Sequence, residues 1–536
     1  MSKYIFVTGG VCSSLGKGIA AASLGCLLES RGLNVRMIKI DPYINVDAGT
    51  MSPYQHGEVY VTDDGAETDL DLGNYERFTT APLARENSIT TGQVYKEVIN
   101  KEREGRFLGR TVQVIPHITD EIKRRIVNIG DKPGVDVTIT EIGGTVGDIE
   151  SIPFLEAARQ FIHDMGRKDV LFVHLTLVPV VGIGELKTKP TQHSVKSLRE
   201  IGIQPDVLLC RTPYKLDNSM RDKIALFTNV DDEAVISAYD VKTSIYEIPL
   251  VYHEQKLDDI VVERLGINNR PADLKAWKCF VDTYNNATRS VRIAIVGKYV
   301  ELHDTYKSIF EALVHGAIAN EVRVEIVKVD SESLEKQENR ESNLANIDGI
   351  LIPGGFGQRG IQGMIQAAGY ARTMKVPCFG ICLGMQIMVI EYARAVTGLP
   401  EADSTEFSPA GPVPVIDLLV EQVDVKVYGG TMRLGRSNTH LLKGMQIRSI
   451  YNSDVISERH RHRYEVSNKY RNALAEAGLK ISGITPDGSL VESIEWPDHP
   501  WGIGVQFHPE FISKPVKPHP LFKSFIQASL KTKELR

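Results

Sequence analysis

The chain has 536 residues, of which 42% are hydrophobic and 24% charged. This composition suits a pair of large α/β domains and excludes a mainly disordered chain. The 62 basic and 68 acidic residues give a formal charge of −6 without basic runs, which argues against nucleic acid as the main partner. The longest apolar stretch, residues 170–184, is interrupted by polar residues and is too short to span a membrane.

Six scattered cysteines occur without any C-x-x-C pair. This spacing fits neither a disulfide framework nor a structural zinc site. The N-terminus also lacks the long apolar region of a signal peptide. We therefore expect a cytoplasmic location.

The first half of the chain predicts an α/β fold built on a parallel sheet with helices on both faces. Short apolar runs predict buried strands at residues 4–8, 35–40, 135–140, 170–177 and 207–210. Residues 19–31 are amphipathic and end at a glycine, which predicts a helix. The order strand, glycine-rich loop, helix, strand is typical of nucleotide-binding domains.

A break near residue 288 predicts a domain boundary. A helix is expected at residues 272–284, and strands then restart at residues 291–296, 322–329, 349–352 and 377–381. We therefore predict a first domain over residues 1–267, a linker helix and connection over residues 268–289, and a second domain over residues 290–536.

Residues 9–18, GGVCSSLGKG, predict a phosphate-binding loop. Glycines let the backbone wrap an anion, the next helix offers free N–H groups, and Lys17 adds a charge for a β- or γ-phosphate. The match to the P-loop pattern is imperfect, because Gly18 replaces the hydroxyl residue that would hold Mg²⁺. The alternative is a tight turn with a surface lysine, but the strand and helix on either side argue against it.

Two carboxylates could take over the role of the missing hydroxyl ligand. Glu141 closes a predicted strand, and Asp71 lies in the acidic segment DDGAETDLDLG. Taken alone, such a segment is more often a solvated loop. Lys187 and Lys189, in ELKTKPTQHS, could grip a triphosphate, with a solvated basic loop as the alternative.

The second half contains a nucleophile elbow, GICLG, with Cys382 at its centre. The elbow follows a predicted strand and opens a helix, whose N-terminus favours a thiolate. Far downstream, His508 can take the thiol proton and Glu510 can orient the imidazole. Amides of residues 353–357 could join the Leu383 N–H in an oxyanion hole.

Plainer interpretations exist for several cysteine and histidine residues. A buried structural thiol is the alternative for Cys382, and the elbow glycines with the later His-x-Glu argue against it. Cys378 is expected to be buried in the strand before the elbow. His460 and His462, in ERHRHRYEV, lack a strand-end context, and we expect them on the substrate side or at the surface.

Taken together, these stretches resemble the CTP synthase family over nearly the whole length of the chain. The matching motifs include IFVTGGV, SSLGKG, MSPYQHGEV, DDGAETDLDLG, EIGGTVGDIES, KTKPTQ, PGGFG, GICLGMQ, STEF, GGTMRLG, ERHRHRYEV and QFHPE. The resemblance implies a P-loop, dethiobiotin synthetase-like amidoligase domain followed by a class I glutamine amidotransferase domain. It also implies that UTP is phosphorylated on O4 by MgATP and that ammonia from glutamine displaces the phosphate to give CTP.

The resemblance further implies Mg²⁺ as cofactor, CTP as feedback inhibitor, GTP as allosteric activator and a homotetramer. It assigns ATP binding to Ser14, Leu15, Gly16, Lys17, Gly18, Ile19, Asp71, Tyr239, Asp240 and Val241, and the metal to Asp71 and Glu141. It assigns UTP or CTP binding to Ser13, Asp148, Ile149, Glu150, Lys187, Thr188, Lys189, Pro190, Thr191, Gln192 and Lys223. It assigns glutamine binding to Gly355, Leu383, Gly384, Met385, Gln386, Glu406 and Arg463, around the catalytic residues Cys382, His508 and Glu510.

The chain departs from the family pattern at three places. Cys12 stands where an aliphatic residue is expected, residues 180–184 are about one residue short, and Lys242-Thr243 make the next stretch about one residue longer. The last departure bears on the adenine-side contacts at residues 239–241. Two other functions fit parts of the chain: a P-loop amidotransferase acting on corrinoid precursors, and a non-enzymatic scaffold or filament protein with decayed sites. The intact catalytic set and Lys17 argue against decay.

Overall fold

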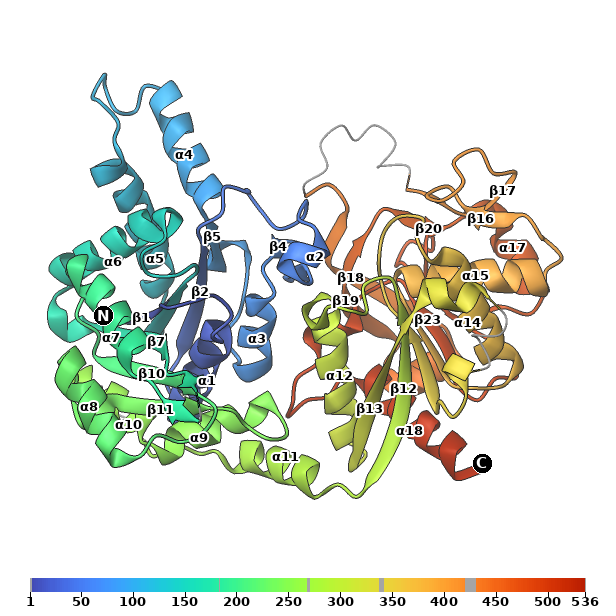
Figure 1. Ribbon diagram of the computed structural model, residues 1–536. Helices are drawn as coiled ribbons and strands as arrows, with labels where there is room; N and C mark the ends of the chain where they lie inside the picture. Colours follow the sequence, from blue (N-terminus) through green and yellow to red (C-terminus); the bar gives the residue numbers. More distant parts are fainter. Residues whose placement is uncertain (1, 183, 268–269, 337–341, 420–429, 536) are drawn as a thin grey trace. The chain divides into compact units, whose positions relative to one another are not determined.

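The structure is a computed structural model that describes residues 2–182, 184–267, 270–336, 342–419 and 430–535. Residue 183 of the shortened segment and residues 268–269 of the predicted linker lie outside these ranges. The chain divides into two compact units, Met1–Asp47 with Asp71–Val281, and Ala48–Leu70 with Asp282–Arg536. Each unit is described by itself below (Figure 1).

Within the described residues, the first unit is built on a seven-stranded sheet with the order β11-β10-β7-β1-β6-β2-β5. Every pairing in it is parallel. The strands are β1 (Lys3–Gly9), β2 (Val35–Asp41), β5 (Ser88–Thr90), β6 (Val137–Ile142), β7 (Val170–Leu177), β10 (Val207–Thr212) and β11 (Val235–Tyr239). A parallel sheet covered on both faces explains why these strands read as apolar runs. The predicted fold class is confirmed for this unit.

Helices cover this sheet (Figure 1). They are α1 (Lys17–Ser30), α3 (Asp71–Phe78), α4 (Thr91–Arg103), α5 (Thr119–Gly130), α6 (Ile152–Met165), α7 (Lys189–Glu200), α8 (Asn218–Thr228), α9 (Ile248–Glu254), α10 (Leu257–Arg264) and, leading into the second unit, α11 (Lys275–Asn286). Phe6 of β1 packs with Ile122 of α5 and Phe154 and Phe161 of α6 in one buried cluster. Helix α1 packs against α3 and α9. A short hairpin, β8 (Val180–Val181) and β9 (Glu185–Leu186), precedes α7.

The second unit contains a nine-stranded sheet in the described part of the chain, with the order β13-β12-β14-β15-β23-β22-β21-β18-β19. The strands are β12 (Arg289–Gly297), β13 (Val322–Asp330), β14 (Gly349–Ile352), β15 (Cys378–Ile381), β18 (Arg433–Leu441), β19 (Val455–His462), β21 (Lys480–Ile484), β22 (Val491–Glu495) and β23 (Gly502–Val505). Pairing is parallel from β13 to β23 and antiparallel from there to β19. The carboxyl ends of the parallel strands therefore share one edge, where β15 and β23 lie side by side.

Helices and a small sheet complete this unit. The helices are α12 (Lys307–Ile318), α14 (Ile361–Thr373), α15 (Leu383–Ala395), α16 (Gln446–Tyr451), α17 (Asn468–Glu476) and α18 (Pro520–Leu535). The small sheet contains β16 (Ala402–Ser404), β17 (Val413–Leu418) and β20 (Tyr464–Val466). Helices α14 and α15 pack against each other, as do α12 and α18.

Residues 48–70 belong to the second unit although they lie near the start of the chain. They form the short helix α2 (Pro53–His56) and the hairpin of β3 (Tyr60–Val61) and β4 (Glu67–Thr68). Arg461 Nε of β19 lies 2.9 Å from Glu67 Oε1, and Arg459 Nε lies 2.6 Å from Asp63 Oδ1. These long-range ion pairs carry no local sequence signal, so this packing was not predicted from the sequence.

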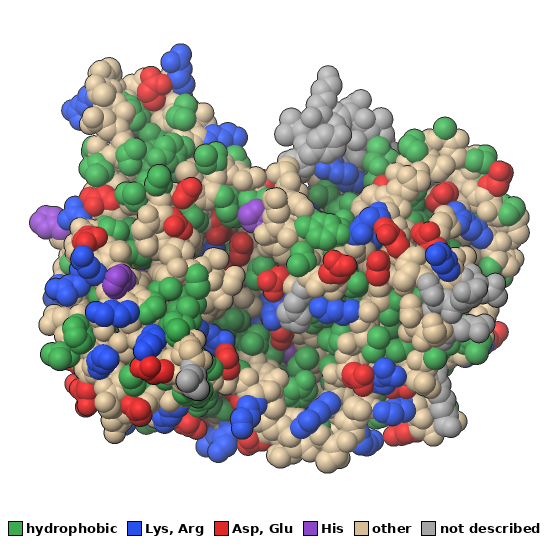
Figure 2. Space-filling view, viewed as in Figure 1, with side chains coloured by type: hydrophobic (Ala, Val, Ile, Leu, Met, Phe, Trp, Pro, Cys, Tyr) green, Lys and Arg blue, Asp and Glu red, His purple; other side chains and the backbone are tan. Residues whose placement is uncertain are grey.

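The surface carries both kinds of charge. On the face drawn in Figure 2, basic and acidic side chains are intermixed, in keeping with the formal charge of −6. Among the helices that the structure describes, none is long and apolar enough to cross a membrane.

Candidate active site

Cys382 sits on a sharp turn between β15 and α15, at the edge of the sheet where the parallel strands end. Its backbone has φ 53° and ψ −105°, a strained conformation for a residue with a side chain. A Cβ added to Gly384 would lie 2.0 Å from the carbonyl oxygen of Ile352, so only glycine allows this close approach. The Cys382 N–H donates to the Val505 carbonyl oxygen at 2.7 Å. The predicted nucleophile elbow is therefore present in the geometry.

His508 and Glu510 lie beside this turn, directly after β23. His508 Nδ1 is 2.7 Å from Glu510 Oε1. A Cβ added to Gly354 would lie 3.0 Å from His508 Cε1 and 3.6 Å from Cys382 Cβ, so both side chains face the same point. Burial lowers the pKa of His508, but Glu510 and Cys382 outweigh it and raise the pKa to about 10. The arrangement favours an imidazolium next to the sulfur, as nucleophilic catalysis by cysteine requires.

A cavity of about 420 Å³ opens over these residues. Its lining includes Cys382, His508, Glu510, Gly354, Gly355, Phe356, Arg461 and Arg463, together with Gly49, Thr50, Met51, Pro53, Glu58 and Val59 from the segment of residues 48–70. All of these residues belong to the second unit. The size suits a small ligand, and the arginines suit one with a carboxylate.

The residues expected to bind glutamine fall into two groups. Gly355 and Arg463 line the cavity, Leu383 and Gly384 form the N-terminus of α15, and Glu406 accepts a hydrogen bond from Gly357 N at 2.6 Å. The other two, Met385 and Gln386, are not among the residues that line the cavity. The side chain of Met385 is buried in the core, and Gln386 Nε2 donates to the Tyr464 carbonyl at 3.0 Å and to Gln506 Oε1 at 3.2 Å.

Two contacts to the Cys382 sulfur were not predicted from the sequence. Gln506 Nε2 donates to Cys382 Sγ at 3.7 Å, and Sγ lies 3.7 Å from the Arg461 carbonyl oxygen. Gln506 is fully buried. Its position directly after β23 and two residues before His508 is the signal that could have identified it.

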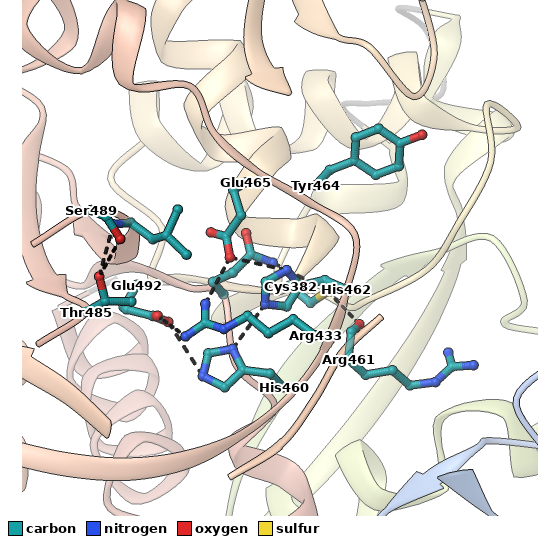
Figure 3. A network of polar contacts seen from close by, with 12 residues as sticks. Cys382, Arg433, His460, Arg461, His462, Tyr464, Glu465, Thr485, Ser489 and Glu492 are labelled. Carbon is teal, nitrogen blue, oxygen red and sulfur yellow. Dashed lines mark hydrogen bonds and ion pairs between the residues drawn. The ribbon is translucent and has the colours of Figure 1, made fainter. Parts of the chain in front are cut away.

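His460 and His462 are buried, so the surface alternative of that prediction was wrong. Figure 3 shows both histidines beside Arg433. They lie on β19, almost fully buried, with His460 Nδ1 3.0 Å from His462 Nε2. Arg433 lies between Glu465 at 2.9 Å and Glu492 at 2.5 Å, beside this pair of histidines. Burial and the charge of Arg433 lower the pKa of both histidines well below the usual value. The alternation of a strand explains the error, because His460 and His462 share the inner face while Arg459 and Arg461 share the other.

In the first unit, the glycine-rich loop connects β1 to α1, as predicted. Helix α1 begins at Lys17 rather than at residue 19, after Gly16 with φ 90°. Lys17 Nζ donates to the Gly144 carbonyl oxygen, just past β6, at 2.8 Å. Burial lowers the pKa of Lys17, while Glu141 and Asp71 oppose that shift. A half-buried ammonium group at a helix N-terminus favours an anionic ligand.

Asp71 and Glu141 converge beside this loop, which fits a site for a hard cation. The Lys39 ammonium bonds both, with Asp71 Oδ2 in close contact and Glu141 Oε1 at 3.0 Å, and it was missed from the sequence. A Cβ added to Gly18 would lie 1.9 Å from Asp71 Oδ1, so the glycine at the position of the usual hydroxyl makes room for this carboxylate. Burial and then the charge of Asp71 raise the pKa of Glu141, which indicates that the pair has capacity for further positive charge.

The residues expected to bind nucleotides follow the carboxyl ends of strands in this sheet. Ser13 follows β1, Asp148 to Glu150 follow β6, Lys187 to Gln192 follow β7, Lys223 follows β10 within α8, and Tyr239 to Val241 end and follow β11. Ligands of open parallel sheets bind at this edge. Lys187 Nζ lies 2.7 Å from Glu185 Oε2, and Lys187 and then Lys223 lower the pKa of Glu185.

Comparisons with known proteins cover the whole chain. Residues 3–267 match the family described as CTP synthase N-terminus, and residues 301–528 match glutamine amidotransferase class-I. A CTP synthase from Carboxydothermus hydrogenoformans is 59% identical over 100% of both chains. A CTP synthase from Geobacter sulfurreducens is 59% identical over 100% of this chain and 99% of its own. A solved glutaminase domain of Trypanosoma brucei CTPS with bound acivicin is 43% identical and covers 45% of this chain and 94% of its own, with a TM-score of 0.42.

Proposed function

Because the chain belongs to the CTP synthase family, we propose that it makes CTP from UTP, ATP and ammonia released from glutamine. The observation that carries this proposal is the 59% identity to a CTP synthase over the full length of both chains. A corrinoid amidotransferase would not match the CTP synthase N-terminus. A scaffold protein with decayed sites would not keep the elbow geometry of Cys382 and the pairing of His508 with Glu510.

The second unit supplies the groups for glutamine hydrolysis. Cys382 Sγ attacks the side-chain amide carbon of glutamine. His508, held by Glu510, accepts the thiol proton. The developing oxyanion accepts hydrogen bonds from the N–H of Leu383 and of the Gly354-Gly355 stretch. Ammonia leaves with the proton from His508, and water then cleaves the glutamyl thioester to release glutamate and the free thiol.

The first unit supplies the groups for ligation. Lys17 and the amides of residues 14–19 bind the ATP phosphates, and Ser13, Lys187, Lys189 and Lys223 bind the pyrimidine nucleotide. Asp71 and Glu141 would hold Mg²⁺, which when bound offsets negative charge on the phosphates. Phosphorylation of the UTP O4 creates a leaving group, and ammonia displaces phosphate to give CTP.

The proposal extends to the remaining site residues and to regulation. Tyr239, Asp240 and Val241 are assigned to the adenine side of ATP, and Asp148, Ile149 and Glu150 to the pyrimidine nucleotide. CTP is proposed as feedback inhibitor at the pyrimidine nucleotide site, GTP as activator of the glutamine reaction, and a homotetramer in the cytoplasm as the working form. The resemblance of the motifs supports these assignments.

The test is direct. The purified full chain, incubated with UTP, ATP, Mg²⁺ and glutamine, with and without GTP, should form CTP, ADP, phosphate and glutamate, measured by chromatography. Omitting UTP should stop ADP formation while some glutamine hydrolysis continues. Glutamine hydrolysis without any CTP, even with ammonium salt supplied, would contradict the proposal.

The raised pKa of His508 predicts the pH dependence of glutamine hydrolysis. With a pKa of about 10, the imidazolium that protonates the departing ammonia persists through neutral pH and is lost as the pH rises through that value. Replacing Glu510 by Gln removes a charge that raises this pKa. The alkaline decline of kcat should therefore move to lower pH, and kcat itself should fall by about 10²-fold or more. Glutamate release measured from pH 6 to pH 10 tests this, and an unmoved decline would contradict it.

A Gly18→Ala substitution tests the proposed metal site. The added methyl carbon would lie 1.9 Å from Asp71 Oδ1, so the carboxylate must move. A displacement of this size can cost about 10²-fold in rate, and we expect that loss in ammonia-dependent CTP synthesis, with a higher Mg²⁺ requirement. Glutamine hydrolysis should persist. Ser23→Ala, in the same helix and at a buried hydroxyl without a hydrogen-bond partner among the described residues, is the matched control and should change neither activity.

A further inference from the structure

Tyr60 is far from His508 in the sequence, but it contacts two residues that in turn contact this histidine. It begins β3, its side chain is fully buried, and it is absent from the lining of the cavity over Cys382. Its hydroxyl donates to the carbonyl oxygen of Phe511 at 2.8 Å and accepts from Arg459 Nη1 at 2.9 Å. One phenol group thus joins the backbone of Phe511 to the side chain of Arg459.

Phe511 and Arg459 both contact His508. The His508 N–H donates to the Arg459 carbonyl oxygen at 2.7 Å. The Phe511 ring stacks on the His508 imidazole with 5.1 Å between ring centroids and 17° between planes. Tyr60 also packs edge-on against the Phe511 ring, with centroids 5.1 Å apart. Contacts therefore run from Tyr60 through Phe511 to the imidazole on one side, and through Arg459 to the His508 backbone on the other.

The position of the hairpin that carries Tyr60 is fixed by charge. Arg459 pairs with Asp63 and Arg461 pairs with Glu67, at 2.6 Å and 2.9 Å. The Arg461 carbonyl oxygen lies 3.7 Å from Cys382 Sγ. Because Arg459 and Arg461 are two residues apart on β19, both side chains reach the hairpin from the same face of the strand. The hairpin is thus attached to the strand that contacts both the nucleophile and the histidine.

We propose that Tyr60 is a positioning residue for glutamine hydrolysis, whose hydroxyl sets the orientation of the His508 imidazole relative to Cys382 and Glu510. The glutaminase site would then be completed by residues 48–70, a segment encoded within the region that matches the CTP synthase N-terminus. The inference rests on the proposed function. The physical basis is the hydrogen bond from the Tyr60 hydroxyl to the Phe511 carbonyl oxygen. Without this donor, Phe511 is held less firmly, and the His508 imidazole stacked on its ring can shift.

Tyr60→Phe in the full chain is the test, because it removes one hydroxyl and keeps the ring. A hydrogen bond of this kind contributes about 0.5–1.5 kcal/mol, so kcat for glutamine hydrolysis should fall about 3- to 10-fold. The KM for glutamine should stay within about twofold, since no cavity contact changes. Ammonia-dependent CTP synthesis should be unchanged. The split between kcat and KM separates positioning from a merely structural role.

Two further variants sharpen the outcome. Tyr451→Phe also removes a phenol bonded to β19, at Glu458, but without a contact to His508, and it should keep full kcat. Asp63→Asn weakens the pairing of Arg459 from an exposed position that also pairs with Arg436. It should lower kcat to a smaller degree than Tyr60→Phe.

The failure of this proposal and of the proposed function give different results. Absence of CTP from the unaltered protein would refute the function itself. With an active protein, an unchanged kcat in Tyr60→Phe would overturn the positioning role. So would a parallel loss of ammonia-dependent activity, or a higher KM at normal kcat.

Discussion

A Cys382→Ala protein should make no CTP from glutamine, yet make CTP from added ammonium salt at close to the unaltered rate. Cys382 occupies the strained elbow position with φ 53°, and without its sulfur no glutamyl thioester can form. Lys17, Asp71 and Glu141 belong to the other compact unit. The ligation reaction proposed there can use ammonia from any source. The assay is CTP formation with each nitrogen source at mildly alkaline pH, where more of the ammonium is present as NH₃.

Cys378→Ala provides the matched control. Cys378 lies four positions earlier, fully buried in β15, and burial raises the pKa of its thiol, so it is chemically inert. That variant should keep both activities. His508→Ala should behave like Cys382→Ala but keep some residual glutamine-dependent activity. Loss of a general base lowers the rate about 10²–10⁴-fold but does not abolish it. Glutamine-dependent CTP from the Cys382→Ala protein would show that another group is the nucleophile, and loss of ammonia-dependent synthesis would show that the two reactions are not separable.

The parts of this molecule that the sequence predicted well are those with a local signal. Strands β7 and β14 were predicted at their observed bounds, because buried parallel strands appear as short apolar runs. The elbow was predictable because its backbone requires glycine at Gly384. His508 and Glu510 were predictable because they follow directly on β23, at the edge where catalytic groups of α/β folds gather.

The parts that were missed depend on long-range polar contacts. The sequence ERHRHRYEV suggests a charged surface, and only the tertiary contacts of Arg433, Glu465 and Glu492 make burial of its histidines acceptable. The pairing of Arg461 with Glu67 joins positions hundreds of residues apart, so no periodicity could reveal it. Lys39, a cation in the apolar stretch of β2 (Val35–Asp41), was a local hint of a buried charge cluster, since a buried lysine needs a partner.

Lys17→Ala is expected to have the converse effect, with CTP synthesis lost from both glutamine and ammonia while glutamine hydrolysis continues. Its side chain is half-buried at the start of α1, where the ammonium group would face the transferring phosphate. Removing one such charge costs about 10²–10³-fold or more in rate. Lys39 cannot take over, because its ammonium already bonds both Asp71 and Glu141. Lys132→Ala, which removes an exposed lysine paired with Glu86, is the matched control and should leave both activities intact. ADP and CTP formation should be measured together with glutamate release. If a folded Lys17→Ala protein still makes CTP from ammonia at near-normal rate, the ATP phosphates do not bind at the loop of residues 9–18.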